Sequence, residues 1–228
     1  MTDINISRDL RGPVLATHGM VASEHPLVSQ AGIDVLRRGG NAFDAALAMS
    51  ALLPVVKPPR SHLGGDAYVL VYPKRAGRVT AICSGGKAPA AASLERYAAG
   101  IPHRGGAAAA VPGLVDAWQA IADTCCSMPL RDLLAPATAC ARDGFPVSRE
   151  LAAVFAASQG LFTRYGTMAR ALCPDGAPPA FGSSSNPGSS TSCWSGSSAR
   201  LPRLPCSCAS ADSAPSSTTR RGGPTRSP

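Results

Sequence analysis

The chain of 228 residues contains 45% hydrophobic residues, which is ordinary for a globular protein and allows one domain with its own core. Its net charge of +8 is unevenly placed, because residues 183–228 hold five Arg and one acid, Asp212, and so carry +4 by themselves. The basic run RRGGPTR has no interleaved aromatic residue, and no apolar run reaches membrane-spanning length. Composition therefore argues against a membrane protein and leaves nucleic acid as the least favoured partner.

Eight cysteines are spread along the chain without a C-x-x-C pair or another zinc-like spacing, so we expect the reduced thiols of a cytosolic protein. The N-terminus, MTDINISRDLRGPV, lacks the apolar segment of a secretory signal, and a cytoplasmic location is expected. The sequence contains no phosphate-binding P-loop and no dinucleotide fingerprint. We therefore expect neither a metal nor a cofactor.

The first helix is predicted to begin at Pro26, because proline suits the first helical position. Apolar residues recur at helical spacing from there to Arg38. The pair Gly39-Gly40 is typical of the end of a helix.

A second helix is predicted from Ala42 to Leu53, with Asn41 as its N-cap and Asp44 in its first turn. Pro54 is expected to end it. Because this helix is apolar on nearly every side, it should be buried on several faces.

Residues 67–72, AYVLVY, predict a strand that is buried on both faces, and residues 78–82 predict its antiparallel neighbour. Three further helices are expected over residues 114–124, 130–142 and 148–158. The chain therefore belongs to the α/β class, with helices packed on an antiparallel hairpin.

Short motifs give little chemistry by themselves. The glycines of LGGD, residues 63–66, favour a tight turn with close backbone approach over a phosphate site. The histidines are scattered and each is interpreted as a capping or surface residue: His18, His25, His62 and His103. No serine-nucleophile elbow is present, and Pro112-Gly113 is interpreted as the opening of a helix.

An ordered series of motifs nevertheless resembles one family. GMVASEHPLVSQAG, LRRGGNAFDAALA and LGGDAYVLVY are followed by KAPAAAS, AVPGLVDAW, DLLAPATACARDGFPVS and LCPDGAPP, over roughly residues 19–179. This series is similar to the N-terminal part of the large subunit of the γ-glutamyltransferases, or glutathione hydrolases. The resemblance implies part of an N-terminal-nucleophile hydrolase, with two stacked sheets between helical layers.

The resemblance also implies a small-molecule amide substrate and a precursor that cuts itself into a large and a small subunit. A threonine that begins the small subunit attacks the amide carbonyl, with its own amino group as the base. No segment of this sequence matches that threonine region, and Thr218-Thr219 lies in a context unlike the family's cleavage site. No residue is therefore named as catalytic, and a chain of these residues alone is expected to be inactive.

The resemblance places one substrate contact in AICSGGKAPA. The transferases have an arginine there that grips a carboxylate, whereas Gly85 stands at that position here. Lys87 is the candidate substrate-binding residue, because a lysine attracts a carboxylate as a point charge, without the two-pronged geometry of arginine. The alternative, a glycine turn with a solvated lysine, stays open. The motif AICSGGKAPA is more similar to the corresponding motif of amidase or acylase relatives.

Three regions are expected: a lead-in over residues 1–18, a partial γ-glutamyltransferase-like domain over 19–182, and a low-complexity tail over 183–228. The tail holds 15 Ser and 6 Pro among 46 residues and has little to bury, which favours disorder. We interpret it as a frameshift near Gly182, with a genuine tail as the alternative. For the chain as a whole, the alternatives are a non-catalytic remnant, a partner of a separately encoded small subunit and, least favoured, a nucleic-acid-binding protein.

Overall fold

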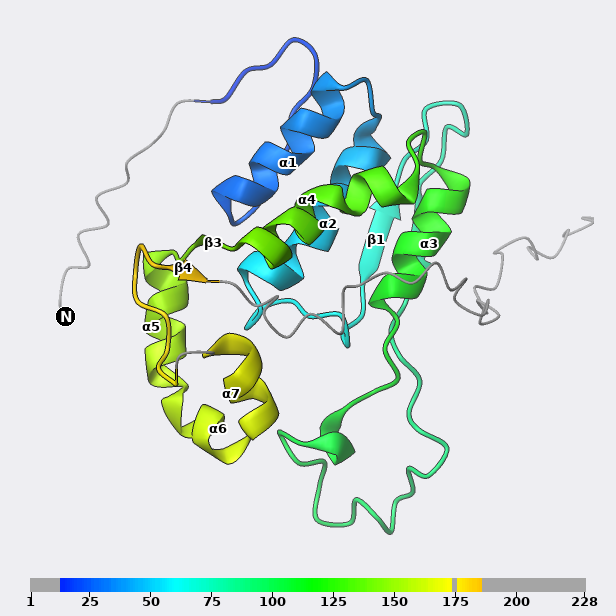
Figure 1. Ribbon diagram of the computed structural model, residues 1–228. Helices are drawn as coiled ribbons and strands as arrows, with labels where there is room; N and C mark the ends of the chain where they lie inside the picture. The colour runs from blue at the N-terminus through cyan, green and yellow to red at the C-terminus, as the bar shows by residue number, and fades with distance from the viewer. Residues whose placement is uncertain (1–12, 174–175, 186–228) are drawn as a thin grey trace, which may run out of the picture.

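The computed structural model describes residues 13–173 and 176–185, which form a group of helices beside a two-stranded hairpin (Figure 1). The helices are α1 (Pro26–Arg37), α2 (Ala42–Val56), α3 (Leu114–Thr124), α4 (Leu130–Asp143), α5 (Arg149–Ala157), α6 (Gln159–Arg164), α7 (Gly166–Leu172) and the short 3-10 helix η1 (Gly106–Ala108). The strands are β1 (Tyr68–Val71), β2 (Thr80–Cys83), β3 (Phe145–Pro146) and β4 (Ser184–Ser185). The predicted α/β class with helices on an antiparallel hairpin is confirmed.

Side chains define the starts of α1 and α2 as the sequence predicts. Nδ1 of His25 accepts a hydrogen bond from the backbone N–H of Leu27 at 3.3 Å, so this histidine is a capping residue. Oδ1 of Asn41 accepts from the N–H groups of Phe43 and Asp44 at 2.8 and 2.9 Å. Oδ2 of Asp44 accepts in return from the Asn41 N–H at 2.7 Å, which completes a capping box.

The prediction that Pro54 ends the second helix is wrong, because α2 continues to Val56. Pro54 lies in the last turn, where the missing N–H costs a single bond to the carbonyl of residue 50. Beyond it, Val55 and Val56 are buried in the core, and the N–H of Lys57 donates to the Leu53 carbonyl at 2.8 Å. Burial of two valines therefore outweighs one lost hydrogen bond.

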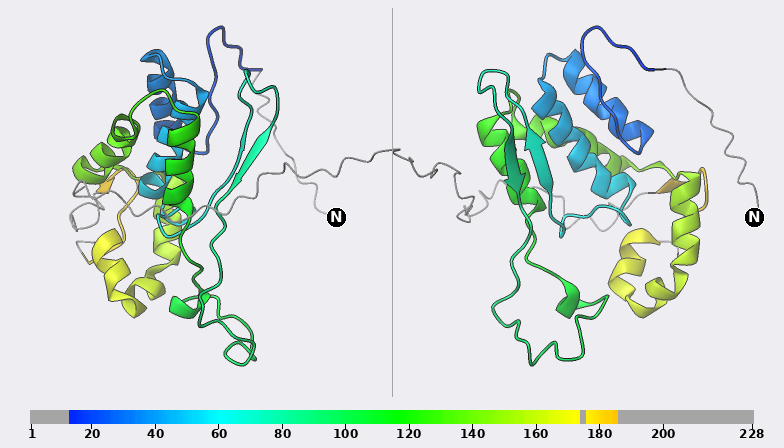
Figure 2. Two further views of the ribbon diagram at one scale, coloured as in Figure 1. Left: turned by 90° about the vertical axis from the view of Figure 1, so that its right-hand side faces the viewer. Right: turned by 180° about the vertical axis from the view of Figure 1, so that it is seen from behind.

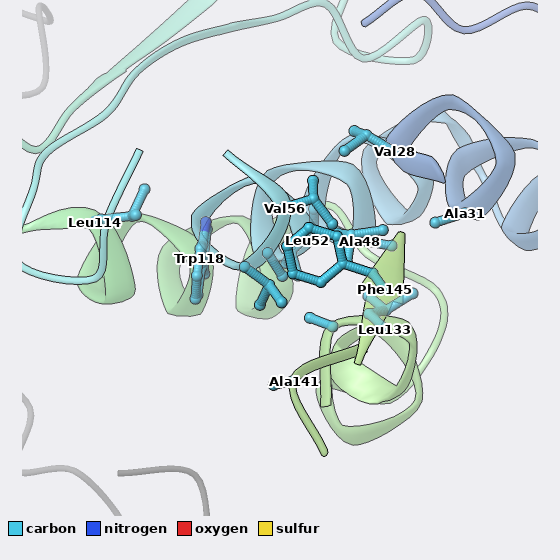
Figure 3. Packing of buried hydrophobic residues seen from close by; sticks show 14 of the residues in the cluster. Val28, Ala31, Ala48, Leu52, Val56, Leu114, Trp118, Leu133, Ala141 and Phe145 are labelled. Carbon is cyan, nitrogen blue, oxygen red and sulfur yellow. The ribbon is translucent and has the colours of Figure 1, made fainter. Parts of the chain in front are cut away.

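Helix α2 is the centre of the core, as its all-round apolar sequence predicts. It packs against α1, α3 and α4, and Leu52, Ala48 and Leu133 are almost fully buried where these helices meet (Figure 3). Trp118 of α3 adds a polar link, since its Nε1 donates to Oγ of Ser50 at 2.8 Å. Each large side chain buried here contributes about 1.5–3 kcal/mol relative to an exposed one.

Strands β1 and β2 pair antiparallel as predicted, with Leu70 opposite Ala81. The prediction that β1 is buried on both faces is wrong. Val71 is buried and Val69 contacts the core, whereas the outward side chains of the hairpin are between 59% and 77% exposed. We call this the outer face, and its large residues are Tyr68, Leu70, Tyr72 and Val79. Figure 2 shows the reason, because the helices cover the hairpin from one side only.

Strands β3 and β4 form a second, very short antiparallel pair that joins α4 and α5 to residues 184–185. The N–H of Val147 donates to the Ser183 carbonyl at 2.9 Å, and the N–H of Gly182 donates to the Val147 carbonyl at 3.0 Å. Residues 183–185 of the predicted tail are thus part of this pair. The rest of the predicted tail, from Asn186 onward, lies outside the described residues.

Candidate functional site

Three segments that are distant in the sequence cross at the end of the hairpin, and we call them the crossing: residues 63–67, 84–87 and 111–113. The N–H groups of Gly113 and Leu114 both donate to the Gly65 carbonyl at 3.0 Å. The N–H of Val111 donates to the Lys87 carbonyl at 3.2 Å. These bonds hold the start of α3 against the segment before β1, and the residues just ahead of α3 against the loop that leaves β2.

The crossing needs glycine at two positions because the backbones approach so closely. A Cβ on Gly86 would lie 1.8 Å from the carbonyl oxygen of Val111, and one on Gly113 would lie 2.0 Å from that of Ser84. Neither contact is possible for a real side chain without movement of the backbone. Gly65 makes a turn in which its N–H donates to the His62 carbonyl at 3.0 Å, so the interpretation of LGGD as a tight turn is confirmed.

Ser84 extends the pairing of the hairpin beyond β2. Its Oγ donates to the Ala67 carbonyl at 3.0 Å and accepts from the Ala67 N–H at 2.8 Å. Its own N–H also donates to the Ala67 carbonyl at 2.9 Å. The Ser84 hydroxyl therefore both donates to and accepts from the backbone of Ala67, which fixes the distance between the two segments.

The predicted site residues lie at the exposed edge of the crossing. Lys87 is exposed, and within residues 13–173 and 176–185 its ammonium makes no ion pair. Gly85 is exposed and lies beside the hydroxyl end of Tyr68, whose Oη would be 2.5 Å from a Cβ at that position. The phenol hydroxyl occupies the space that a side chain at position 85 would need, so an arginine there would displace it. That Lys87 binds a substrate carboxylate stays a prediction.

Asp44 ties the loop before α4 to the start of α2, and it is fully buried. Its Oδ1 accepts from the N–H groups of Ser127 and Met128 at 3.0 and 3.1 Å, and its Oδ2 accepts from the Ser127 hydroxyl. Burial pushes the pKa of Asp44 upward, but the hydrogen bonds from Ser127, Asn41 and Met128 together outweigh it and hold the pKa below its usual value. Both oxygens of this carboxylate accept hydrogen bonds that hold the fold together, so we assign it a structural role.

A second charged cluster lies where α1, α2 and α5 meet. Nζ of the buried Lys57 donates to Glu24 at 3.0 Å and to Glu150 at 3.1 Å. The hydrogen bond that Lys57 donates to Glu24 is the largest effect on its pKa and, together with the bond to Glu150, outweighs desolvation and raises that pKa. Burial and the nearby Lys57 charge lower the pKa of His25. Lys57 bridges Glu24 and Glu150 and so binds the N-terminal segment to α5.

The thiols within the described residues are free. Burial, with the Asp44 carboxylate nearby, raises the pKa of Cys126 to about 12, and burial also raises the pKa of Cys140 and Cys173. A thiol with a raised pKa is a poor nucleophile. Over residues 13–173 and 176–185, no group of three His, Cys, Asp or Glu side chains could hold a metal ion. No helix in that part of the chain is long and apolar enough to cross a membrane.

Comparison with known proteins decides the family. The family model described as Gamma-glutamyltranspeptidase matches residues 28–187. The chain belongs to the gamma-glutamyltranspeptidase family. This match confirms the resemblance inferred from the motifs.

Relatives and solved structures agree with this assignment. The chain is 41% identical over 140 residues to the glutathione hydrolase-like YwrD proenzyme of Bacillus subtilis, covering 60% of this chain and 27% of that protein. It is 40% identical over 142 residues to the oxamate amidohydrolase proenzyme of Klebsiella pneumoniae, covering 59% and 27%. The γ-glutamyltranspeptidase of Helicobacter pylori superposes with a TM-score of 0.72 at 28% identity, covering 75% of this chain and 52% of that one.

The predicted fold, part of an N-terminal-nucleophile hydrolase, is confirmed by these similarities. The chain spans about a quarter of the length of the curated relatives that it matches. The crossing escaped sequence reasoning, because the bonds of Gly65, Ser84 and Val111 link segments that are far apart along the chain. The only signal for it was the recurrence of glycine in LGGD, SGGK and VPG.

Proposed function

We propose that residues 13–185 are one part of an enzyme that cleaves an amide bond by acyl transfer, with the crossing as a wall of its substrate site. One observation carries the proposal. The edge that holds Gly85, Tyr68 and Lys87 adjoins the outer face, which is apolar and exposed. A contiguous apolar face of this kind is typical of a surface that another part of the protein covers. In the stacked-sheet fold of the family, a second sheet would cover it and enclose the edge.

The polypeptide of 228 residues is proposed to be inactive by itself. The family resemblance implies a threonine nucleophile at the start of a small subunit, and no segment of these residues matches it. Ser84 and Cys126 are unsuited to replace it, since the Ser84 hydroxyl is bonded to backbone and burial raises the pKa of the Cys126 thiol to about 12. The first test is the hydrolysis of a γ-glutamyl anilide and of oxamate by purified 1–228. Release of product by this chain would overturn the proposal of inactivity.

A second test concerns the rest of the enzyme. We propose that another reading frame past codon 182 resumes the family's sequence and reaches a threonine-led cleavage site. Sequencing the gene from codon 170 and translating all three frames tests this. The repaired product should cut itself and hydrolyse an amide, and the same product with its leading threonine replaced by alanine should do neither. If no frame resumes the family's sequence, the frameshift is refuted.

The substrate is proposed to differ from a γ-glutamyl group. A phenol hydroxyl beside Gly85 offers one neutral hydrogen bond in place of the paired bonds that an arginine forms with a carboxylate. Lys87 remains able to attract a carboxylate as a point charge. The similarity to an oxamate amidohydrolase supports a small amide substrate of this kind. The repaired enzyme should therefore have a higher kcat/KM for oxamate than for glutathione, and the opposite order would refute this choice.

The outer face also favours a second candidate function. A separately encoded small subunit could cover it, in which case 1–228 is a partner chain in a two-chain enzyme. Co-expression with a small subunit from a relative should then give a stable complex and restore hydrolysis. Binding of nucleic acid by the arginines after position 199 concerns residues outside those that the structure describes, and it stays a prediction.

A further inference from the structure

A hollow of about 700 Å³ lies away from the crossing, between the long loop after β2 and helix α6. Figures 1 and 2 both show this loop, which runs through η1, reaching toward α6. The residues that line the hollow are His103, Arg104, Leu161, Arg164 and Tyr165. Three of these five side chains are basic and none is acidic.

One face of α6 supplies its side of the hollow. Leu161 and Arg164 are spaced i, i+3 on α6 and so lie on the same side of the helix, and Tyr165 is the C-cap residue that follows it. The guanidinium carbon of Arg164 is 5.7 Å from the centroid of the Tyr165 ring, a cation–π contact that restricts where this charge points. The charge is therefore held at the hollow by the residue that caps its helix.

Among the residues that the structure describes, no acidic side chain lines the hollow to pair with its two arginines. Arg37, Arg131 and Arg142 each form an ion pair with an aspartate on the same helix. Neither Arg104 nor Arg164 has an ion pair within residues 13–173 and 176–185. Two like charges at one hollow repel each other. An anion bound between them would be attracted to both charges and would offset that repulsion.

We propose that this hollow is a binding site for a small oxyanion, either a phosphoryl or a carboxylate group. Arg104 from the loop and Arg164 from α6 each present a planar fork that matches two oxygens of such a group. His103 and the hydroxyl of Tyr165 add further hydrogen-bond donors at the rim. Because the basic side chains are exposed, the site is open and the ligand exchanges freely with solvent.

Titration calorimetry of the 228-residue chain with inorganic phosphate and, separately, with succinate tests the proposal. We expect saturable binding of one anion per chain. Either Arg104→Gln or Arg164→Gln should weaken it about tenfold, the effect of losing one charge-assisted hydrogen bond. Tighter binding of phosphate identifies a phosphoryl ligand, and tighter binding of succinate identifies a carboxylate.

Arg75→Gln is the matched control, because it removes the same charge from the exposed turn between β1 and β2, outside the hollow. It should leave the affinity within about twofold, since exposed charges beyond about 10 Å are largely screened at 0.1 M salt. Circular dichroism checks that each variant keeps its helices. Absence of saturable binding by both anions overturns the proposal. Equal weakening by Arg75→Gln and Arg164→Gln also overturns it, since binding would then follow net charge alone.

Discussion

The substitution Asp44→Asn tests whether the buried carboxylate holds the start of α2 against the loop before α4. Asparagine has the same shape, so it leaves no cavity. Its oxygen can still accept from the N–H groups of Ser127 and Met128, as Oδ1 does now. Its NH₂ group, however, replaces Oδ2 and meets the Asn41 N–H, which now donates to that oxygen at 2.7 Å. Two donors then face each other.

The expected loss of stability follows from these bonds. A hydrogen bond to a charged group contributes about 1.5–3 kcal/mol, and a buried N–H left without a partner costs about 1–3 kcal/mol. The two effects overlap because they concern the same N–H of Asn41, so we expect about 3 kcal/mol. Asp34→Asn is the matched control. The Asp34 side chain is half exposed and its ion pair with Arg37, at 3.8 Å, is weak, so this substitution should cost less than about 1 kcal/mol.

Urea unfolding followed by circular dichroism measures both losses. The pH dependence gives a second readout. Because the pKa of Asp44 is lower in the folded chain, its contribution is present above the unfolded pKa of about 3.9 and is lost as pH falls through the folded pKa. Asp44→Asn should therefore flatten the loss of stability in acid. Equal losses for the two variants, or an unchanged acid profile, would refute this account of Asp44.

Three further predictions concern other parts of the structure. Gly86→Ala should destabilise the chain by about 1–3 kcal/mol because it presses on backbone, whereas Gly106→Ala, with open space around its Cβ, should change stability by less than about 0.5 kcal/mol in urea unfolding. Because the outer face is apolar and exposed, we expect 1–228 to self-associate, and Leu70→Lys, which places a charge there, should reduce this in sedimentation velocity. An unchanged distribution would contradict this role. Because the pKa of Lys57 is raised, its stabilising contribution is complete below its unfolded pKa of about 10.4 and is lost as pH rises through the folded value. Unfolding of Lys57→Met should therefore lack this alkaline loss, and a profile like that of the parent chain would count against the ion pairs.

Local signals in the sequence were reliable where neighbours along the chain decide the conformation. The cap at Asn41 and the bounds of α3 follow from interactions within one turn, and both were predicted correctly. The prediction at Pro54 was wrong because the hydrogen bond lost at proline costs less free energy than burial of Val55 and Val56 provides. That burial depends on helices elsewhere in the chain. The family could be inferred from motif order alone, because each motif is short but their succession is specific.

Faces and long-range partners, in contrast, could not be predicted from local patterns. The apolar run 67–72 indicates a strand, but it does not say that Ala67 and Val69 pack against the core and Val71 is buried while Leu70 faces outward. The aspartate at position 44 was predicted as a first-turn residue, yet its bonds to Ser127 and Met128 cross more than 80 residues.

The sequence by itself determined the hairpin, the family and the helices α1 to α5 apart from the end of α2, because capping, periodicity and motif order depend on residues that are neighbours along the chain. Helices α6 and α7 and the pair β3–β4 were not predicted. Only the tertiary structure decided that Gly86 and Gly113 admit no side chain, that the Tyr68 hydroxyl lies beside Gly85, and that Arg104 and Arg164 line one hollow. The physical reason is the same in each case. These properties depend on distances between segments, and such distances are set by how the helices pack on α2 and the hairpin rather than by any single stretch of chain.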